Sequence, residues 1–425
     1  MARLLYTLAV FMLLPAAFLH LLWRSRRQAE YLRHWDERLG LFGDKPAPAR
    51  PVIWIHAVSV GETRAAEPLV ALLRQRYPNH DIAFSHATPT GRATSLEIYG
   101  ETVDRLYLPY DTPGAVRRFL SRLQPVLGVI METEIWPNLV AACRQMNIPL
   151  LLVNARLSAR SARRYALLPT LTQDALRGLS GIAAQGEEDA RRLAALGAPR
   201  VTVTGNLKFD LAPPQELVER GRAWRSDWRR TTDSGVLLAA STREGEEALI
   251  LDALRRRPAT KLLLLLVPRH PQRFDAVANL AAGMGFRVQR RSAGMALAAD
   301  TTLLLGDSMG EMYAYYAASD LAFIGGSLLA YGSQNLIEGC AVATPVLLGP
   351  STYNFAWAAE AALACGAARQ VGNADELIAV ASSLLDDRSK LAEMGRAGLE
   401  FSSRHRGASE RTLALLEKCL IPARR

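Results

Sequence analysis

The chain has 425 residues, 49% of them hydrophobic and 7% aromatic, and its formal net charge at pH 7 is +10. This length exceeds what one ordinary hydrophobic core uses, so we expect two domains. The charge comes almost wholly from arginine and lacks basic blocks interleaved with aromatic residues, which argues against nucleic-acid binding. It fits an anionic membrane surface or phosphorylated substrates, although a GC-rich genome would give the same arginine bias.

The N-terminus predicts a membrane anchor over residues 1–25. Residues 4–22 carry no charged side chain and, at ~1.5 Å per residue, are about as long as a bilayer core is thick. One arginine precedes this run and a cluster of three follows it, so the positive-inside rule places the rest of the chain in the cytoplasm. The anchor is single-pass or, because Pro15 and His20 weaken the span, monotopic. Residues 31–40 predict an amphipathic segment whose tryptophan and arginines suit the membrane interface.

Apolar runs alternate with helical stretches along the rest of the chain, which predicts parallel sheets covered on both faces. The first predicted strands are residues 51–55, 82–84, 105–108, 126–131, 150–153, 181–184 and 201–203. The second series is residues 236–240, 262–267, 287–289, 302–305, 321–324, 345–348 and 369–371. A polar, proline-containing stretch separates the two series. We expect Rossmann-like domains at 26–205 and 216–425 with a linker at 206–215, and the last helix is a candidate to return to the first domain.

The stretch 54–62 reads as a buried strand that stops at a glycine and is followed by Glu62. Helical spacing over residues 63–77 places Glu62 at a strand-to-helix switch, the edge where α/β proteins bind their ligands. A carboxylate there can act as a general base. The alternative is that Glu62 only favours the helix dipole, worth ~0.3–1 kcal/mol.

Two further sites in the first half follow strands or the linker. Glu132 and Glu134 come after the strand at 126–131 and would lie beside Glu62 if both strands end in one cleft, where neighbouring acids raise each other's pKa. The alternative is that these acids belong to a helix start. Lys208 lies in the predicted linker, where it could neutralise a leaving phosphate or simply be solvated.

The second half has polar groups at three strand ends. Arg269 follows a strongly apolar strand and suits a nucleotide phosphate. Gly306 and Gly310 would let the backbone approach a base or phosphate, unless residue 307 or 308 only caps a helix. Asn335 and Glu338 have the spacing of a capping box, whereas in a nucleotide-sugar enzyme the glutamate would bind ribose hydroxyls. The histidines show no ligand spacing and no Asp-x-Asp pair occurs, so we expect no metal.

Together these motifs resemble those of the 3-deoxy-D-manno-octulosonic acid (Kdo) transferases of lipopolysaccharide synthesis. The matching segments run from the predicted anchor to the last helix. They are residues 58–62, 131–138, 154–158, 205–210, 241–247, 267–271, 306–311 and 349–355. The sequence departs at 331–335, which reads Tyr-Gly-Ser-Gln-Asn where many relatives read Arg-Gly-Gly-His-Asn.

The resemblance implies an α/β GT-B fold, with two Rossmann-like domains facing across a cleft and an N-terminal membrane anchor. It implies CMP-Kdo as donor, bound by the second domain, and a lipid A precursor (lipid IVA) as acceptor, bound by the first. By the family's pattern Glu62 matches the catalytic base, while Glu132 and Lys208 match positions that stabilise the transition state. The CMP site is matched by Pro268, Arg269, Met309, Gly310, Glu311, Asn335, Leu336, Ile337 and Glu338.

We therefore interpret the chain as an inverting, metal-independent glycosyltransferase at the cytoplasmic face of the cell inner membrane. One alternative is another membrane-associated GT-B enzyme that uses a UDP-sugar. Another is a non-enzymatic scaffold that binds anionic lipid through its arginines, although such a scaffold has no need of acids and glycines at successive strand ends.

Overall fold

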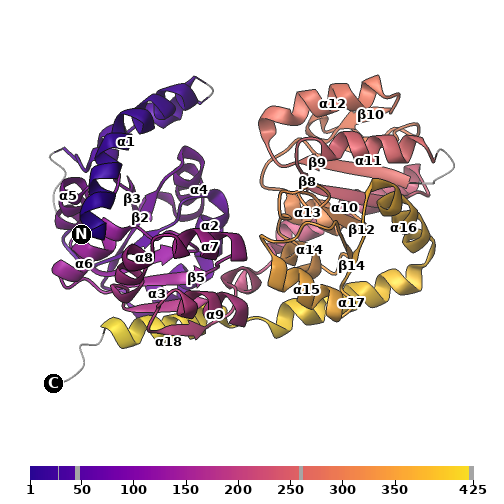
Figure 1. Cartoon of the computed structure of the whole chain (residues 1–425). Helices are drawn as coiled ribbons and strands as arrows, with labels where there is room; N and C mark the ends of the chain where they lie inside the picture. The colour runs from indigo at the N-terminus through magenta and orange to yellow at the C-terminus, as the bar shows by residue number, and fades with distance from the viewer. Residues whose placement is uncertain (27, 44–47, 258–261, 421–425) are drawn as a thin grey trace. The chain divides into compact units, whose positions relative to one another are not determined.

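The computed structural model describes residues 1–26, 28–43, 48–257 and 262–420. The chain forms two compact units (Figure 1). Unit 1 consists of Met1–Leu211 and the C-terminal segment from Arg406, and unit 2 of Ala212–His405. Each unit contains a seven-stranded sheet in which every strand pairs in parallel.

The sheet of unit 1 has the strand order β3-β2-β1-β4-β5-β6-β7. Its strands are β1 (Val52–His56), β2 (Asp81–His86), β3 (Asp104–Tyr107), β4 (Pro125–Met131), β5 (Leu150–Ala155), β6 (Gly181–Ala184) and β7 (Val201–Val203). Successive side chains of β1 enter two different cores: Val52 and Trp54 pack on one face, Ile53 and Ile55 on the other. Both faces are therefore covered, which is why these strands read as unbroken apolar runs.

Helices and short 3-10 turns (η) surround this sheet. They are α1 (Ala2–Ser25), η1 (Ala29–Leu32), η2 (Trp35–Leu39), α2 (Val60–Ala65), α3 (Glu67–Arg76), α4 (Pro89–Tyr99), η3 (Gly100–Thr102), α5 (Pro113–Leu123), α6 (Pro137–Gln145), α7 (Ala159–Ala166), α8 (Pro169–Arg177), α9 (Glu187–Ala195), η4 (Leu207–Asp210) and α18 (Ala408–Leu420). The last helix, α18, packs on α3 and η4, so the C-terminal segment completes unit 1. Asp210 fixes its start, because its carboxylate accepts the N–H groups of Gly407 (2.6 Å) and Ser409 (2.5 Å).

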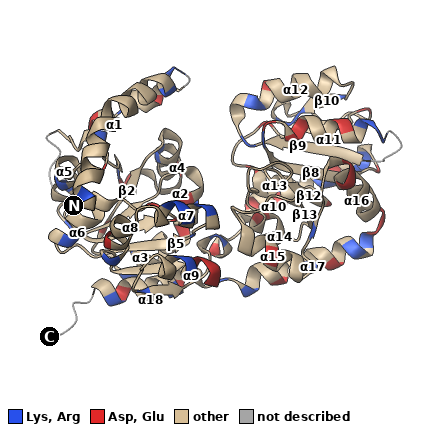
Figure 2. Cartoon of the chain, viewed as in Figure 1, with Lys and Arg blue, Asp and Glu red and all other residues tan. Residues whose placement is uncertain are grey.

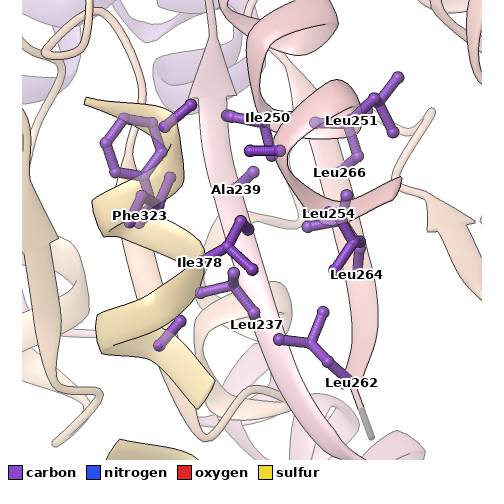
Figure 3. Close-up of a cluster of buried hydrophobic side chains, with 14 of the residues drawn as sticks. Leu237, Ala239, Ile250, Leu251, Leu254, Leu262, Leu264, Leu266, Phe323 and Ile378 are labelled. Atoms are coloured by element: carbon purple, nitrogen blue, oxygen red, sulfur yellow. The ribbon is translucent and has the colours of Figure 1, made fainter. Parts of the chain in front are cut away.

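The sheet of unit 2 has the order β10-β11-β9-β8-β12-β13-β14. Its strands are β8 (Gly235–Thr242), β9 (Leu262–Pro268), β10 (Val288–Arg290), β11 (Leu303–Leu305), β12 (Leu321–Ile324), β13 (Val346–Leu348) and β14 (Ala368–Gln370). The covering elements are α10 (Gln215–Thr231), α11 (Glu246–Arg255), η5 (Pro271–Arg273), α12 (Phe274–Gly283), η6 (Arg291–Ala293), α13 (Met312–Ala317), α14 (Ile337–Ala341), α15 (Ala356–Ala364), α16 (Ala374–Asp386) and α17 (Arg388–Arg404). Figure 3 shows leucines of β8 and β9 packed against α11.

Two predictions differ from the structure. The helix predicted over residues 63–77 is broken at Ala66 into α2 and α3, since Pro68 at the start of α3 has no N–H to continue the first helix. Residues 31–40 form 3-10 turns, and Arg38 is buried there: its guanidinium donates to Ala87 O (3.0 Å) and lies over the Tyr107 ring. Arg38 is therefore part of the fold of unit 1.

Helix α1 is long and apolar enough to cross a membrane, a test that core helices and signal sequences also pass. Figure 2 shows it without charged residues except toward its ends. Two polar side chains near its N-terminus contact the globular part of unit 1: Tyr6 Oη donates to Asp111 Oδ2 (3.0 Å) and Thr7 Oγ1 to Asn138 Oδ1 (3.1 Å). One side of α1 is thus held by unit 1.

Candidate active site

Glu62 lies in the first turn of α2, just after β1. Its carboxylate turns back over the helix start, where Oε2 accepts the N–H of Val58 (2.7 Å) and Oε1 accepts the hydroxyl of Ser59 (3.0 Å). These two hydrogen bonds fix the orientation of the acid. They also mean that Glu62 stabilises the start of α2. Its geometry is therefore compatible both with a role at the helix dipole and with a role as general base.

The surroundings of Glu62 move its titration toward neutral pH. Burial, followed by the charges of Glu132 and Glu134, raises the pKa of Glu62 to about 8, although the Val58 and Ser59 hydrogen bonds oppose this rise. The structure therefore brings the acids that follow β1 and β4 together, as these neighbouring strands predict. A carboxylate with this pKa can accept a proton from a substrate hydroxyl near pH 8.

Glu132 follows β4 with a backbone φ of +59°, and its N–H donates to Val153 O on β5 (2.9 Å). Lys208 Nζ lies 3.0 Å from its Oε1, and Arg156 Nη2 lies 3.6 Å from its Oε2. Burial alone would raise the pKa of Glu132, but these two cations hold it below its usual range. Glu132 is thus a fixed anion, whereas burial and the neighbouring Glu132 raise the pKa of Glu134.

Lys208 belongs to η4 within unit 1, and a chain of buried amides positions it. Leu207 N donates to Asn154 Oδ1 (3.1 Å), Gln185 Nε2 donates to Asn154 O (2.9 Å), and Asn206 Nδ2 donates to Gln185 Oε1 (3.1 Å). Sequence reasoning assigned no role to Arg156 or to these amides. Arg156 and Gln185 directly follow β5 and β6, and this position is the signal that could have found them. Asn154 lies within β5 and Asn206 follows β7.

In unit 2, Arg269 directly follows β9, and its N–H donates to Thr242 O on β8 (3.0 Å). Burial lowers the pKa of Arg269, and the nearby charge of Glu338 opposes this. Among the described residues no carboxylate forms a salt bridge of 4.0 Å or less with this guanidinium. A half-buried arginine in this setting has donors available for an anion such as a phosphate.

Asn335 and Glu338 form a local pair at the start of α14. Asn335 Nδ2 donates to Glu338 Oε1 (3.0 Å), and Asn335 Oδ1 accepts the N–H of Ile337 (3.1 Å). The helix-capping alternative therefore describes a real part of their geometry. Leu336 and Ile337 are buried in the core, so only their backbone is available to a ligand.

The segment Met309, Gly310 and Glu311 follows β11, the neighbour of β9, and so shares the carboxyl edge with Pro268 and Arg269. Met309 is 60% exposed and Gly310 has a φ of +80°, a conformation that lets the backbone turn sharply. Glu311 is held by two cations: Arg220 Nη1 lies 3.0 Å and Arg291 Nη2 3.6 Å from its Oε1.

The loop at 331–335, where the sequence departs from many relatives, is built around Tyr331. Its hydroxyl donates to Glu244 O (3.1 Å), and the guanidinium of Arg243 lies 4.8 Å from its ring centroid. Tyr331 thereby holds the loop after β12 against the loop after β8. In the part of the chain that the structure describes, no group of three or more His, Cys, Asp or Glu side chains could hold a metal ion.

Comparisons with known proteins identify the family of this chain. A family profile described as 3-deoxy-D-manno-octulosonic-acid transferase (kdotransferase) matches residues 33–211. A 3-deoxy-D-manno-octulosonic acid transferase of Bordetella pertussis is 43% identical over 437 residues, covering 99% of this chain and 100% of the relative. One of Haemophilus influenzae is 40% identical over 401 residues, covering 93% of each chain.

The solved structures show the fold. The crystal structure of a glycosyltransferase from Rickettsia africae ESF-5 superimposes with a TM-score of 0.62 at 13% sequence identity, covering 88% of this chain and all of the other. Two units of this kind, each built on a parallel seven-stranded sheet, form a GT-B-like fold. The chain belongs to the 3-deoxy-D-manno-octulosonic-acid transferase family. Its enzymatic activity is Kdo transfer in lipopolysaccharide synthesis.

Proposed function

We propose that the chain transfers Kdo from CMP-Kdo to a lipid A precursor, lipid IVA, with Glu62 as the general base. The observation that carries this proposal is the placement of Glu62, whose carboxylate two hydrogen bonds hold just after β1, near the acids that follow the neighbouring strand β4. Burial and these acids raise the pKa of Glu62 to about 8. A base is most effective when its pKa lies near the working pH, because it then binds a proton readily and is still often ionised.

The proposed reaction is an inverting displacement. A hydroxyl oxygen of the acceptor attacks the anomeric carbon of Kdo, its proton passes to Glu62, and the bond from that carbon to the phosphate oxygen breaks. CMP leaves with the electron pair. Lys208, ion-paired to Glu132, and Arg156 supply fixed positive charge around the acids, which supports roles for Glu132 and Lys208 in stabilising the transition state.

The donor's nucleotide is assigned to unit 2. Arg269 would bind the phosphate, and Glu338, oriented by Asn335, would accept hydrogen bonds from ribose hydroxyls. The buried Leu336 and Ile337 would offer only backbone groups. Pro268 and the sharp turn at Met309, Gly310 and Glu311 would let the protein backbone approach the cytosine ring or the phosphate of CMP.

The enzyme is proposed to work at the cytoplasmic face of the cell inner membrane. Helix α1 is the observation that supports a membrane location, since it is apolar along most of its length. Because Tyr6 and Thr7 near its N-terminus contact unit 1, the monotopic arrangement fits this helix better than a full span. The basic residues that follow it suit the anionic cytoplasmic leaflet. A membrane-bound enzyme would meet a lipid acceptor at the surface where that lipid resides.

The direct test is to incubate the purified full chain with CMP-Kdo and lipid IVA and to measure the product mass. Each transfer should add one Kdo unit and release one CMP. Added CMP should inhibit the reaction by competing with the donor, whereas added UDP should not. Inhibition by UDP alone would favour the UDP-sugar alternative, and lipid binding without any product would favour the scaffold.

A further inference from the structure

The outward face of α7 carries a row of cations that ends in two leucines. Arg160, Arg163, Arg164 and Leu167 have the i, i+3, i+4, i+7 spacing that places side chains on one face of a helix. All four are exposed, and so is Leu168. The inner face of α7 is anchored, because Ala162 and Tyr165 pack against the core of unit 1.

Leu167 and Leu168 expose apolar side chains to solvent, which is unfavourable unless another apolar surface covers them. Leu167 is 78% and Leu168 60% exposed, among the most exposed apolar side chains outside α1 in the described chain. Leu168 directly precedes α8, and α1 packs on α8, so the pair lies in the same part of unit 1 as the apolar N-terminal helix. Apolar side chains beside a row of arginines are typical of helices that lie in a membrane interface.

The arginines of α7 are not neutralised within the part of the chain that the structure describes. None of the three forms an ion pair with a carboxylate within 4.0 Å. The neighbouring helices carry acids: Glu188 on α9 already pairs with Arg191 and Arg192. Among the described residues, Glu187 on α9 and Asp174 on α8 form no ion pair of 4.0 Å or less with the arginines of α7. The face therefore presents uncompensated positive charge, which complements an anionic surface.

The opposite, inner side of α7 adjoins the acids. Tyr165, on the inner side of α7, donates its hydroxyl to Thr133 O (3.3 Å), which lies between Glu132 and Glu134. The nearby charge of Glu134 also contributes, after burial, to the raised pKa of Tyr165. A bilayer bound to the outer side of α7 would hold its lipids one helix thickness from the proposed site.

We propose that Arg160, Arg163, Arg164, Leu167 and Leu168 form a second membrane contact, the α7 surface, which binds the anionic phospholipid headgroups of a bilayer. The arginines contact phosphates while the leucines enter the interface. This inference rests on the proposed membrane location and specifies which part of unit 1 faces the bilayer.

The test uses the full chain carrying Cys365→Ser and Cys419→Ser, with Leu168→Cys labelled by an environment-sensitive fluorophore. Leu249→Cys is the matched control, because Leu249 is a 43% exposed leucine on α11 of unit 2. With vesicles of phosphatidylcholine and phosphatidylglycerol, the emission at position 168 should shift to shorter wavelength and be quenched by lipid-borne quencher. Position 249 should show neither change, and pure phosphatidylcholine should give a smaller change at 168.

Changing Arg160, Arg163 and Arg164 together to glutamine should reduce the response at 168 at least threefold in the anionic vesicles. Co-sedimentation of every variant reports the α1 contact separately. Retained sedimentation with no response at 168 overturns the α7 surface alone. Loss of sedimentation by the parent chain overturns the membrane location and this surface with it. A response produced by soluble inorganic phosphate without vesicles would assign the arginines to a free phosphate and overturn the bilayer contact.

Discussion

Lys208 Nζ lies 3.0 Å from Glu132 Oε1, and this ion pair divides three neighbouring acids into two kinds. With Arg156, the lysine keeps Glu132 ionised although it is buried. The negative charge of Glu132 then adds to burial in raising the pKa of Glu62 and Glu134. A cation from η4 thus contributes, through one carboxylate, to the raised pKa of the acid proposed as base.

Glu62→Gln should slow the chemical step by ~10²–10⁴-fold, because the amide keeps the size of the side chain but cannot accept the proton. CMP affinity should change little, since the nucleotide is assigned to unit 2. Single-turnover rates with binding measured in parallel check this. Near wild-type turnover would end the general-base role and make Glu134 the next candidate.

The rate should rise with pH and level off above about 8, the pKa that burial and the neighbouring acids give Glu62. Stability should follow the opposite course. Because this pKa lies above the ordinary value of 4.5, the contribution of protonated Glu62 to stability is complete below pH 4.5 and is lost as pH rises through about 8. Thermal unfolding of wild type and Glu62→Gln between pH 5 and 9 checks the sign. A slope in that range that Glu62→Gln leaves unchanged would contradict it.

Lys208→Met should lower turnover and move the rising limb of the pH–rate profile to lower pH. Without the ammonium, Glu132 protonates more easily, and its weaker negative charge then raises the pKa of Glu62 less. Lys390→Met is the control, because Lys390 is an exposed lysine paired with Glu393 on a helix of unit 2. If Lys208 had only a structural role, Lys208→Met would lower stability and leave the rising limb of the pH–rate profile at its wild-type pH.

Arg269→Ala and Glu338→Ala should each weaken CMP binding by ~1.5–3 kcal/mol, the cost of losing a hydrogen bond to a charged group. Calorimetric titration with CMP measures this. Thermal stability must be recorded for Glu338→Ala, because Asn335 would lose its carboxylate partner at the start of α14. Arg255→Ala, at an exposed arginine of the same unit, should bind CMP normally. If both test variants bound CMP with unchanged affinity, the proposed CMP site at the carboxyl edge of the unit 2 sheet would be wrong.

A chain that begins at Gln28 should bind membranes much more weakly and keep its fold. The cut lies before Glu37 and Arg38, which are buried in unit 1, so a deletion up to residue 53 would damage the globular part as well. Flotation with vesicles in low and high salt measures the loss. Full, salt-resistant retention of the shortened chain would contradict α1 as the main anchor.

The strands were predictable because a parallel strand buried on both faces is a continuous apolar run. β9, with five consecutive leucines, is the clearest example. The break at Ala66 could have been predicted from Pro68, which has no N–H to continue a helix, but the helical spacing hid it. The burial of Arg38 could not, because it depends on contacts with residues far along the chain. Glu62 could be found from its place after β1. Its raised pKa could not, because that depends on Glu132, Lys208 and Arg156, which meet only in the folded unit.

The capping of α18 by Asp210 has a consequence for synthesis on the ribosome. Unit 1 is discontinuous: roughly 200 residues separate Leu211 from Arg406, so at ~5–20 residues per second its sheet waits roughly 10–40 s for its last helix. During that interval the apolar surface of unit 1 that Ala408 and Leu416 of α18 later cover stays open to solvent and to chaperones. Unit 2 is continuous in sequence and emerges complete first. A nonsense mutation after residue 405 would therefore damage the unit that was translated earliest.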